Sequence, residues 1–390
     1  MNLRKWQKEA LPIWKKKRRG VVKVITGAGK TYFAIKCIQD VLNSPEGPEK
    51  VLILVPTINL LDQWVLDLQK HLKQRIDKLG GGFKTNFRED ICVATYASFK
   101  KLSDSIDRKD IFLICDECHK VGTENLGKTL KKNWGATLGL SATPERDFDD
   151  NFEEIIIPIL GPIIYEYDYS KAYLDKVISK FKLLNIYAPL TEDEDEDYLR
   201  ITKKIAKRIG ILGGLDKKDQ ILKLLFLERK RLVNNAFNRI PSAVKAIQQI
   251  KKNKWLIFSE TIIQAEKLKK ILDNYGFKSA EYHSKISPVL RMHNLYLFKN
   301  DLIEILITCK SLDEGFDYPE LDSAIILSAS STSRQRIQRL GRVIRNSSKK
   351  REALVISIYC TDEEYEKLTI EQKAHEKIGI EVKWSKLNFL

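Results

Sequence analysis

The segment FLICDECHKV contains two different sets of side chains that could do chemistry. Cys115, Cys118 and His119 have the C-x-x-C-H spacing of covalent haem attachment, and C-x-x-C also occurs in redox and zinc sites. Asp116 and Glu117 lie between the two sulfurs and directly follow an apolar run. Such a run predicts a buried strand that ends in two carboxylates, so the sulfurs and the carboxylates indicate different functions.

Residues elsewhere in the chain do not support zinc binding or haem attachment by Cys115 and Cys118. A zinc site would need a second pair of cysteine or histidine ligands, but the other cysteines, at positions 37, 92, 309 and 360, are isolated. Haem attachment takes place outside the cytoplasm in bacteria, whereas the N-terminus lacks the apolar core of a secretory signal. No apolar run approaches the ~18 residues of a membrane span. We expect a cytoplasmic protein with buried free thiols and without haem, zinc or a membrane segment.

A glycine-rich loop follows the apolar run VVKVIT and begins a helix. Gly27 and Gly29 would let the backbone amides approach a phosphate at the helix N-terminus. Lys30 would reach the β- and γ-phosphates, and the Thr31 hydroxyl would ligate Mg²⁺. Val24 stands where the complete G-x-x-x-x-G-K-[ST] pattern has its first glycine, and a plain glycine-rich turn is the alternative. The expected ATP-binding loop consists of Thr26, Gly27, Ala28, Gly29, Lys30 and Thr31.

Asp116 and Glu117 supply the acidic partner that such a loop requires. Open parallel sheets bind ligands at the carboxyl ends of their strands, which is where these two acids are expected. Asp116 would hold Mg²⁺, and Glu117 would polarise the water that attacks ATP. Neighbouring residues of an extended strand point in different directions, so the two carboxylates can take separate roles. The alternative, an exposed acidic loop, does not explain the apolar run before them.

Apolar strand-like runs alternate with amphipathic helical patterns in two parts of the chain, which predicts parallel α/β domains. The expected strands are residues 21–26, 51–56, 91–96, 111–116 and 136–143, then 254–259, 279–284, 304–309, 323–329 and 352–359. We expect an ATP-binding domain at 1–168, a linker with a helical insertion at 169–240, a second α/β domain at 241–375 and a C-terminal tail at 376–390.

The chain is strongly basic. Its 390 residues are 31% charged and carry a formal net charge of +16. This excess is typical of a protein with a polyanionic partner, most simply nucleic acid. The alternative is a generally lysine-rich surface, and composition alone does not decide between the two.

An ordered series of motifs resembles the superfamily 2 helicases and translocases. In the first α/β part the motifs are LRKWQKEAL, TGAGKT, VLILVPTINLLDQW, VATYASF, the DEAH-like DECH and SATP. In the second part they are WLIFSET, YHSKIS, ILITCKSLDEGFDYP and RQRIQRLGRVIR. The spellings LRxxQ, LVPTxxLLxQW, LDEGxDxP and QRLGRxxR look most like the XPB-type DNA helicase branch and its prokaryotic relatives.

The resemblance implies two tandem RecA-like domains that hydrolyse Mg-ATP in the cleft between them. The expected catalytic residues are then Lys30, Asp116, Glu117, Gln338, Arg342 and Arg345. The spacing of the last three places them on one face of a helix. By the same resemblance, Arg342 and Arg345 would act as arginine fingers. Such a residue typically raises the rate of nucleotide hydrolysis by ~10³–10⁵-fold. Further expected ATP contacts are Arg4, Gln7, Gly315 and Asp317.

The same resemblance places threonine hydroxyls on the nucleic-acid backbone, where hydroxyls suit sequence-independent phosphate contact. A threonine within a strand is also simply a good strand former. The expected phosphate contacts are Thr57, Thr95, Thr261 and Thr308. The residues expected to couple hydrolysis to that contact are His119, Ser141 and Thr143.

We therefore expect an ATP-dependent DNA helicase or translocase that moves on or unwinds duplex or forked DNA in repair, recombination or defence. A nuclease or repair factor is a candidate protein partner. An RNA helicase is an alternative that the spelling DECH, rather than DEAD, weakly disfavours. A second alternative is an ATP-switched nucleic-acid-binding motor subunit of a larger complex.

Overall fold

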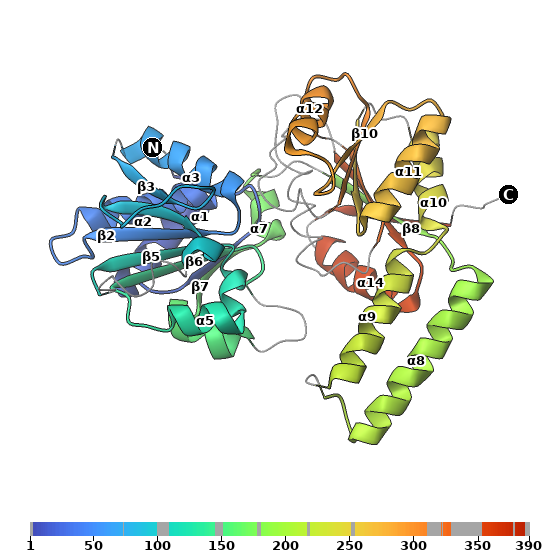
Figure 1. The fold of residues 1–390 in the computed structure, drawn as a ribbon, viewed down its shortest axis with the longest axis horizontal. Helices are drawn as coiled ribbons and strands as arrows, with labels where there is room; N and C mark the ends of the chain where they lie inside the picture. The colour runs from blue at the N-terminus through green and yellow to red at the C-terminus, as the bar shows by residue number, and fades with distance from the viewer. Residues whose placement is uncertain are drawn as a thin grey trace. The chain divides into compact units, whose positions relative to one another are not determined.

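The computed structural model describes residues 3–72, 74–99, 109–144, 151–177, 181–216, 219–250, 254–309, 321, 323–328, 353–376 and 379–386. The chain divides into two compact units, Met1–Asp175 and Lys176–Leu390 (Figure 1). In the described residues each unit is built on one seven-stranded sheet with helices packed on it. This confirms the predicted fold class of two parallel-sheet α/β domains.

The first unit has the strand order β3-β4-β2-β5-β6-β1-β7, and the pairings are parallel. Its strands are β1 (Val21–Val24), β2 (Lys50–Val55), β3 (Ile76–Leu79), β4 (Ile91–Thr95), β5 (Ile111–Asp116), β6 (Ala136–Ser141) and β7 (Ile163–Tyr167). Its helices are α1 (Lys5–Lys17), α2 (Lys30–Leu42), α3 (Ile58–Leu72), α4 (Tyr96–Phe99), η1 (Cys118–Gly122), α5 (Glu124–Leu130), η2 (Phe152–Ile156), α6 (Ile157–Leu160) and α7 (Tyr169–Leu174).

The first sheet is apolar along its central strands because parallel sheets are covered on both faces. Every residue of β5 and of β6 is buried. Helix α3, which packs on β2 and β4, buries Leu61, Trp64, Val65 and Leu68, a set with helical spacing. Since parallel strands run in one direction, β1, β2, β4, β5 and β6 end at the same edge of the sheet, and loops at this edge carry the predicted motifs.

The second unit has the strand order β10-β11-β9-β12-β13-β8-β14, again with parallel pairings. Its strands are β8 (Phe181–Tyr187), β9 (Trp255–Ser259), β10 (Ser279–Tyr282), β11 (Ile305–Cys309), β12 (Ser323–Ile326), β13 (Ala353–Tyr359) and β14 (Glu381–Lys386). Its described helices are α8 (Glu192–Leu212), α9 (Gln220–Asn234), α10 (Arg239–Gln249), α11 (Ile262–Asn274), α12 (Pro288–Lys299) and α14 (Asp362–Glu376).

Two strands of this sheet lie outside the expected second domain. The sequence analysis assigned β8 to the linker and β14 to a C-terminal tail, whereas β8 pairs with both β13 and β14. β14 is a polar edge strand with exposed positions, so it lacks the apolar run that marks a central strand. Its Trp384 packs against Tyr359 and Tyr365, with ring centroids 5.5 and 4.8 Å away.

Helices α8 and α9 form a hairpin between β8 and α10 (Figure 1). The acidic run at residues 192–197 begins α8, where Thr191 and Glu194 form a capping box and negative charge suits the helix dipole. The hairpin has a small core of its own, formed by Ile201, Ile205 and Leu222. In the part of the chain that the structure describes, no helix is long and apolar enough to cross a membrane.

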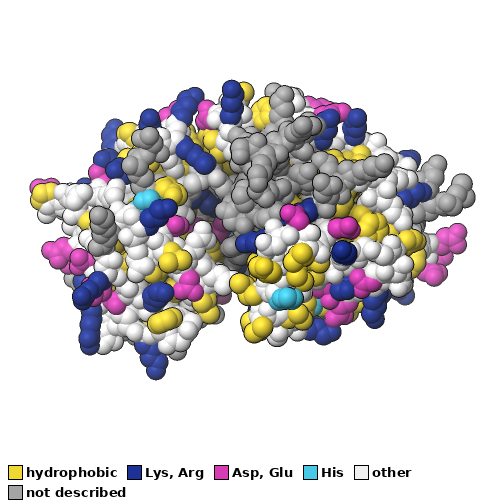
Figure 2. Space-filling model, turned by 90° about the horizontal axis from the view of Figure 1, so that it is seen from above, with side chains coloured by type: hydrophobic (Ala, Val, Ile, Leu, Met, Phe, Trp, Pro, Cys, Tyr) yellow, Lys and Arg dark blue, Asp and Glu magenta, His cyan; other side chains and the backbone are white. Residues whose placement is uncertain are grey.

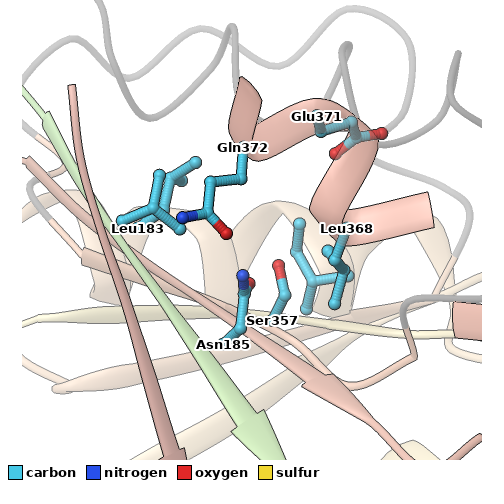
Figure 3. Close-up of a pocket in the computed structure, with 8 residues that line it drawn as sticks. Leu183, Asn185, Ser357, Leu368, Glu371 and Gln372 are labelled. Atoms are coloured by element: carbon cyan, nitrogen blue, oxygen red, sulfur yellow. The ribbon is translucent and has the colours of Figure 1, made fainter. Parts of the chain in front are cut away.

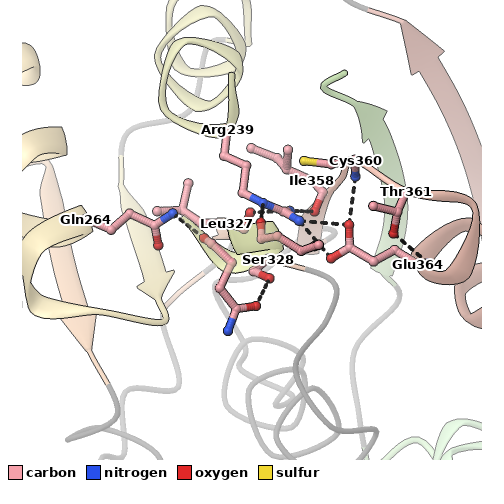
Figure 4. Close-up of polar contacts among 10 residues, drawn as sticks. Arg239, Gln264, Leu327, Ser328, Ile358, Cys360, Thr361 and Glu364 are labelled. Carbon is pink, nitrogen blue, oxygen red and sulfur yellow. Dashed lines mark hydrogen bonds and ion pairs between the residues drawn. The ribbon is translucent and has the colours of Figure 1, made fainter. Parts of the chain in front are cut away.

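Arg239 of α10 holds four other elements of the second unit together from a fully buried position (Figure 4). Its Nη2 makes two 2.8 Å bonds to the carboxylate of Glu364 on α14. Its Nη1 donates to the carbonyls of Leu327 and Ile358, which follow β12 and end β13, at 2.8 and 2.6 Å. Its Nε donates to the carbonyl of Val233 at 2.8 Å. Burying this cation is tolerated because its donors meet so many acceptors.

A small cavity lies between α14 and the sheet (Figure 3). Asn185 of β8 and Gln372 of α14 point into it, and Leu183, Ser357 and Leu368 also line it. Its volume of about 10 Å³ has room for roughly one water molecule. The cavity is therefore far too small for a nucleotide.

Replacing Arg239 tests the buried network. Arg239→Met leaves Glu364 and three carbonyls without their donor, so we expect the free energy of unfolding to fall by about 3–5 kcal/mol. Denaturant titration measures this change, and Arg239→Met combined with Glu364→Leu should regain part of the loss. The control is Lys128→Ala, which removes an exposed pair with Glu124 and should change stability by less than about 0.5 kcal/mol. A stability of Arg239→Met equal to that of the wild type would contradict this account.

Candidate functional site

The glycine-rich loop at residues 25–29 joins β1 to α2. Gly27 and Gly29 have φ angles of 85° and 93°, in the left-handed region that glycine adopts without steric cost. Gly29 is the N-cap residue of α2, so Lys30 and Thr31 stand in the first helical turn. The unpaired amides of a helix start and its positive dipole end bind anions. The loop thus has the geometry that the sequence analysis predicted for a phosphate site.

Side chains from the N-terminus hold the carbonyls of this loop. Each of three side chains donates one hydrogen bond to a successive loop carbonyl: Arg4 Nη1 to Gly27 (3.3 Å), Trp6 Nε1 to Ala28 (3.0 Å) and Gln7 Nε2 to Gly29 (2.8 Å). The Oε1 atom of Gln7 accepts from the backbone N–H of Arg4 at 2.8 Å. Arg4 and Gln7, expected at the nucleotide, therefore also order the loop that would receive its phosphates. The contact of Trp6 with the loop was not predicted, because a single tryptophan in an amphipathic helix usually indicates a core residue.

Asp116 ends β5 in a buried position and is held on several sides. Its Oδ2 accepts from Trp64 Nε1 at 2.9 Å, and its Oδ1 accepts from the backbone N–H of Glu117 at 3.0 Å. Its carbonyl accepts from the hydroxyl of Tyr96 at 2.8 Å. Neither aromatic partner was predicted. The motif at residues 51–64 includes Trp64, but no sequence pattern indicated that Trp64 or Tyr96 contacts Asp116.

Glu117 lies at the turn from β5 into η1, with φ 49° and ψ 54°. This left-handed conformation is unfavourable for a residue other than glycine and re-aims the carboxylate away from the strand direction. Oε1 of Glu117 accepts from Lys30 Nζ at 3.1 Å. Oε2 lies 3.5 Å from both His119 Nδ1 and Ser141 Oγ. Asp116 and Glu117 therefore point to different neighbours, as separate roles require.

Burial and charge act together on the ionisation of these groups. Burial would by itself raise the pKa of Glu117, but Lys30 and His119 hold that pKa below its ordinary value. Burial opposes the charge of Lys30, yet Glu117 and Asp116 raise its pKa. Burial raises the pKa of Asp116 although Lys30 opposes the rise. Near neutral pH the Lys30–Glu117 pair is consequently ionised, which leaves Glu117 as a hydrogen-bond acceptor.

Two of the three expected coupling residues, His119 and Ser141, lie beside Glu117, and the third, Thr143, is bonded to Ser141. Ser141 ends β6, and its Oγ is 3.5 Å from His119 Nδ1 and accepts from the backbone N–H of Thr143 at 3.1 Å. His119 and Ser141 are both buried. A continuous polar path therefore runs from the carboxylate of Glu117 to the backbone that follows β6.

Three of the four expected phosphate contacts begin helices. The hydroxyl of Thr57 accepts from Leu60 N–H at the start of α3, and that of Thr261 accepts from Gln264 N–H at the start of α11. Thr95 ends β4 and its hydroxyl accepts from Ser98 N–H. Thr308 lies within β11 and is buried. Thr57 and Thr95 come from the first unit and Thr261 and Thr308 from the second.

The remaining predicted site residues lie outside the described residues. They are Gly315, Asp317, Gln338, Arg342 and Arg345. Their proposed roles consequently stay predictions.

The described side chains fit Mg-ATP. The loop amides and Lys30 suit phosphates, while the Thr31 hydroxyl and Asp116 are oxygen ligands of the kind Mg²⁺ takes. Among the described residues, the hydroxyl oxygens of Thr26 and Thr143 are buried without a hydrogen-bond partner, as expected at a ligand site. Clusters of three or more His, Cys, Asp and Glu side chains that could hold a metal do not occur in the described ranges. Mg²⁺ needs no such cluster, since it binds through one or two carboxylates plus substrate phosphates.

The cysteines that share this segment are packed in the core. Cys115 and Cys118 are fully buried, and the other cysteines, at positions 37, 92, 309 and 360, are also buried. Burial raises the pKa of both thiols, so neither is a thiolate at neutral pH.

Substituting both cysteines tests this assignment. We expect Cys115→Ala combined with Cys118→Ala to retain measurable ATPase activity and to lose about 1–2 kcal/mol of stability through lost packing. Cys360→Ala, a buried cysteine of the second unit, is the control for the cost of one cavity. A folded double variant without ATPase activity would assign chemistry to the sulfurs.

Comparison with known proteins identifies the family. The family descriptions "Type III restriction enzyme, res subunit" and "Helicase conserved C-terminal domain" match residues 1–146 and 237–347. The chain is 30% identical over 377 residues to the DNA 3'-5' translocase XPB2 of Sulfurisphaera tokodaii, covering 92% of this chain and 81% of that protein. It is 26% identical over 375 residues to the putative DNA 3'-5' helicase Rad25 of Haloarcula marismortui, covering 94% of this chain but only 54% of that protein.

The fold is similar to that of Saccharomyces cerevisiae Dbp5 bound to RNA and ADP BeF3. The TM-score is 0.63 at 16% identity, and the match covers 98% of this chain and 90% of that one. At this identity the likeness concerns the fold alone. The identity to XPB2 over most of both chains, together with the two family matches in order, leads to one conclusion: the chain belongs to the XPB-like branch of the superfamily 2 helicases and translocases and is a nucleic-acid-dependent ATPase.

Proposed function

We propose that this protein couples Mg-ATP hydrolysis to movement on DNA. The proposal rests on how one edge of the sheet in the first unit is divided between residues for ATP and residues for nucleic acid. The phosphate loop, the acid pair and Ser141 follow β1, β5 and β6, which are neighbours in the sheet. Thr57 and Thr95 follow β2 and β4, the next strands along the same edge. A change at the nucleotide half therefore has a short path to the nucleic-acid half.

The residues of the phosphate loop bind and orient ATP. Its amides and the N-terminus of α2 accept the phosphate charge, and Lys30 exchanges its contact with Glu117 for the γ-phosphate. Mg²⁺, held by Thr31 and Asp116, would neutralise charge on the β- and γ-phosphates when bound. Trp64 keeps the Asp116 carboxylate in one orientation through its 2.9 Å hydrogen bond.

Glu117 orients the attacking water and accepts its proton. Its ionised carboxylate and its re-aimed backbone suit a group that must face the γ-phosphate. His119 and Ser141, beside the same carboxylate, relay a change at Glu117 to Thr143 and the backbone after β6. We further propose that Asp317 and Gly315 contact the nucleotide and that Gln338, Arg342 and Arg345 act at the γ-phosphate, where the two arginines supply positive charge.

DNA is the proposed partner, in duplex or forked form. Both curated relatives described above are named for action on DNA in the 3'-5' direction. Figure 2 shows lysine and arginine side chains scattered over the visible face among acidic ones, without one concentrated basic patch. The basic residues therefore act through the net charge of +16, which supports general attraction to a polyanion. The helix starts at Thr57 and Thr261 suit phosphate contact that is independent of sequence.

The cellular setting belongs to the same proposal. We also propose that the protein acts in repair, recombination or defence. Its proposed location is the cytoplasm, and its proposed protein partner is a nuclease or repair factor.

Glu117→Gln separates binding from hydrolysis. The amide keeps the size of the side chain but cannot accept a proton, so we expect the ATPase rate to fall by roughly 10²–10⁴-fold. ATP affinity should remain within about twofold, because the phosphate loop is unchanged. A fluorescent nucleotide titration and a phosphate-release assay measure the two quantities. Glu124→Gln, an exposed position of the same unit, is the matched control, and normal turnover by Glu117→Gln would reject Glu117 as the base.

Nucleic-acid stimulation of the ATPase identifies the partner. We expect duplex or forked DNA to raise the rate severalfold or more and RNA to raise it little. The rates with single-stranded DNA, duplex DNA, forked DNA and RNA are measured at one salt concentration, because phosphate contacts depend on salt. Stimulation by RNA alone would replace the proposal with an RNA helicase. DNA binding that depends on nucleotide but produces no strand or triplex displacement would favour the ATP-switched subunit.

A further inference from the structure

The loop between β3 and β4 presents an exposed aromatic ring that the proposed mechanism does not use. Phe83 is 56% exposed, although phenylalanine is a residue that proteins normally bury. Its neighbour Phe87 shows the ordinary behaviour, being only 3% exposed. What the exposed ring of Phe83 could contact depends on its surroundings.

The backbone that carries Phe83 is a tight turn rather than a loose loop. Gly80 and Phe83 exchange two backbone hydrogen bonds, of 3.2 and 3.1 Å. Gly81 and Gly82 between them have φ angles of 62° and 93°, the positive values of a type I′ turn. A turn closed in this way holds the ring of Phe83 out with little conformational freedom to lose on binding.

This turn lies against the proposed nucleic-acid contacts. A Cβ atom built on Gly80 would be 3.0 Å from the side chain of Thr95, and one built on Gly81 would be 3.1 Å from Ile58. Ile58 directly follows Thr57 and begins α3. The backbone of Phe83 is thus hydrogen-bonded to Gly80, which lies against Thr95, while Gly81 lies against Ile58, the neighbour of Thr57.

The charges around the ring favour a nucleic acid over an apolar protein partner. Lys78 Nζ lies 5.2 Å from the centroid of the Phe83 ring and also pairs with Asp62 at 3.2 Å, and the exposed Lys84 follows Phe83 directly. One aromatic ring beside cations is the combination with which proteins bind single strands, because bases stack on the ring while cations meet phosphates. A protein-docking surface would instead need a contiguous apolar patch.

We propose that Phe83 stacks on an unpaired base of the DNA strand whose phosphates lie at Thr57 and Thr95. The inference rests on the proposed function and extends it, because it assigns a base contact where the family resemblance implies backbone contacts. Bases within a duplex are already stacked on each other, so the contact favours a strand with open bases, as at a fork.

The test compares variants of Phe83 on two DNA probes. One is a single-stranded oligonucleotide with 2-aminopurine placed at each position in turn, and the other is a blunt duplex of the same sequence. Phe83→Ala and Phe83→Leu should weaken single-strand binding by roughly 5–100-fold and abolish the quenching seen at one 2-aminopurine position. Phe83→Trp should preserve both, while duplex affinity should change less than about twofold in every variant.

The controls separate stacking from apolar contact and from misfolding. Phe83→Leu keeps an apolar side chain without a π face, so wild-type binding by this variant would overturn the proposal. Phe237→Ala removes a comparably exposed ring of the second unit and should leave binding unchanged. Equal weakening of the single strand and the duplex by Phe83→Ala would also overturn it. Wild-type protein that binds neither DNA probe would refute the proposed function itself, whereas wild-type binding unaffected at Phe83 would refute only the stacking contact.

Discussion

The parallel direction of the strands is the constraint on which the candidate site depends. Because β1, β5 and β6 are neighbours and run the same way, the phosphate loop, the acid pair and Ser141 meet at one edge of the sheet. Because β2 and β4 continue that edge, Thr57 and Thr95 lie along it as well. One reversed strand would carry its motif to the opposite edge. The site is therefore a property of strand direction before it is a property of any single side chain.

Within that frame, the buried charges depend on each other. Lys30 and Glu117 lie 3.1 Å apart with little exposure to solvent, so each offsets the cost of burying the other. Asp116 is stabilised by the charge of Lys30 and accepts hydrogen bonds from two neutral donors, the indole N–H of Trp64 and the backbone N–H of Glu117. Glu117 adds a left-handed backbone, a conformation that is uncommon for residues other than glycine. In the second unit, buried Arg239 is instead satisfied by one carboxylate, by two carbonyls near the ends of strands and by the carbonyl of Val233 in α9.

Much of the fold followed from local patterns. Central strands such as β2 and β5 are continuous apolar runs. The start of α8 is marked by a capping threonine that precedes acidic residues. Strands without such runs were missed: β3, β7 and β14 lie at or next to sheet edges and carry polar residues. The residues of the boundary strand β8 were assigned to the linker, because no local pattern tells a strand which sheet it joins.

The sequence by itself determined which residues could do the chemistry. Glycines at 27 and 29, a lysine that opens a helix and two acids at the end of a buried strand are local features, set by backbone geometry and hydrophobic periodicity. Only the tertiary structure decided what these residues touch. Lys30 meets Glu117 across 87 positions, Trp64 meets Asp116 across 52, and Gly80, bonded to Phe83, lies against Thr95. Such contacts depend on the register of paired strands and on the packing of the helices that connect them, which short-range patterns do not encode.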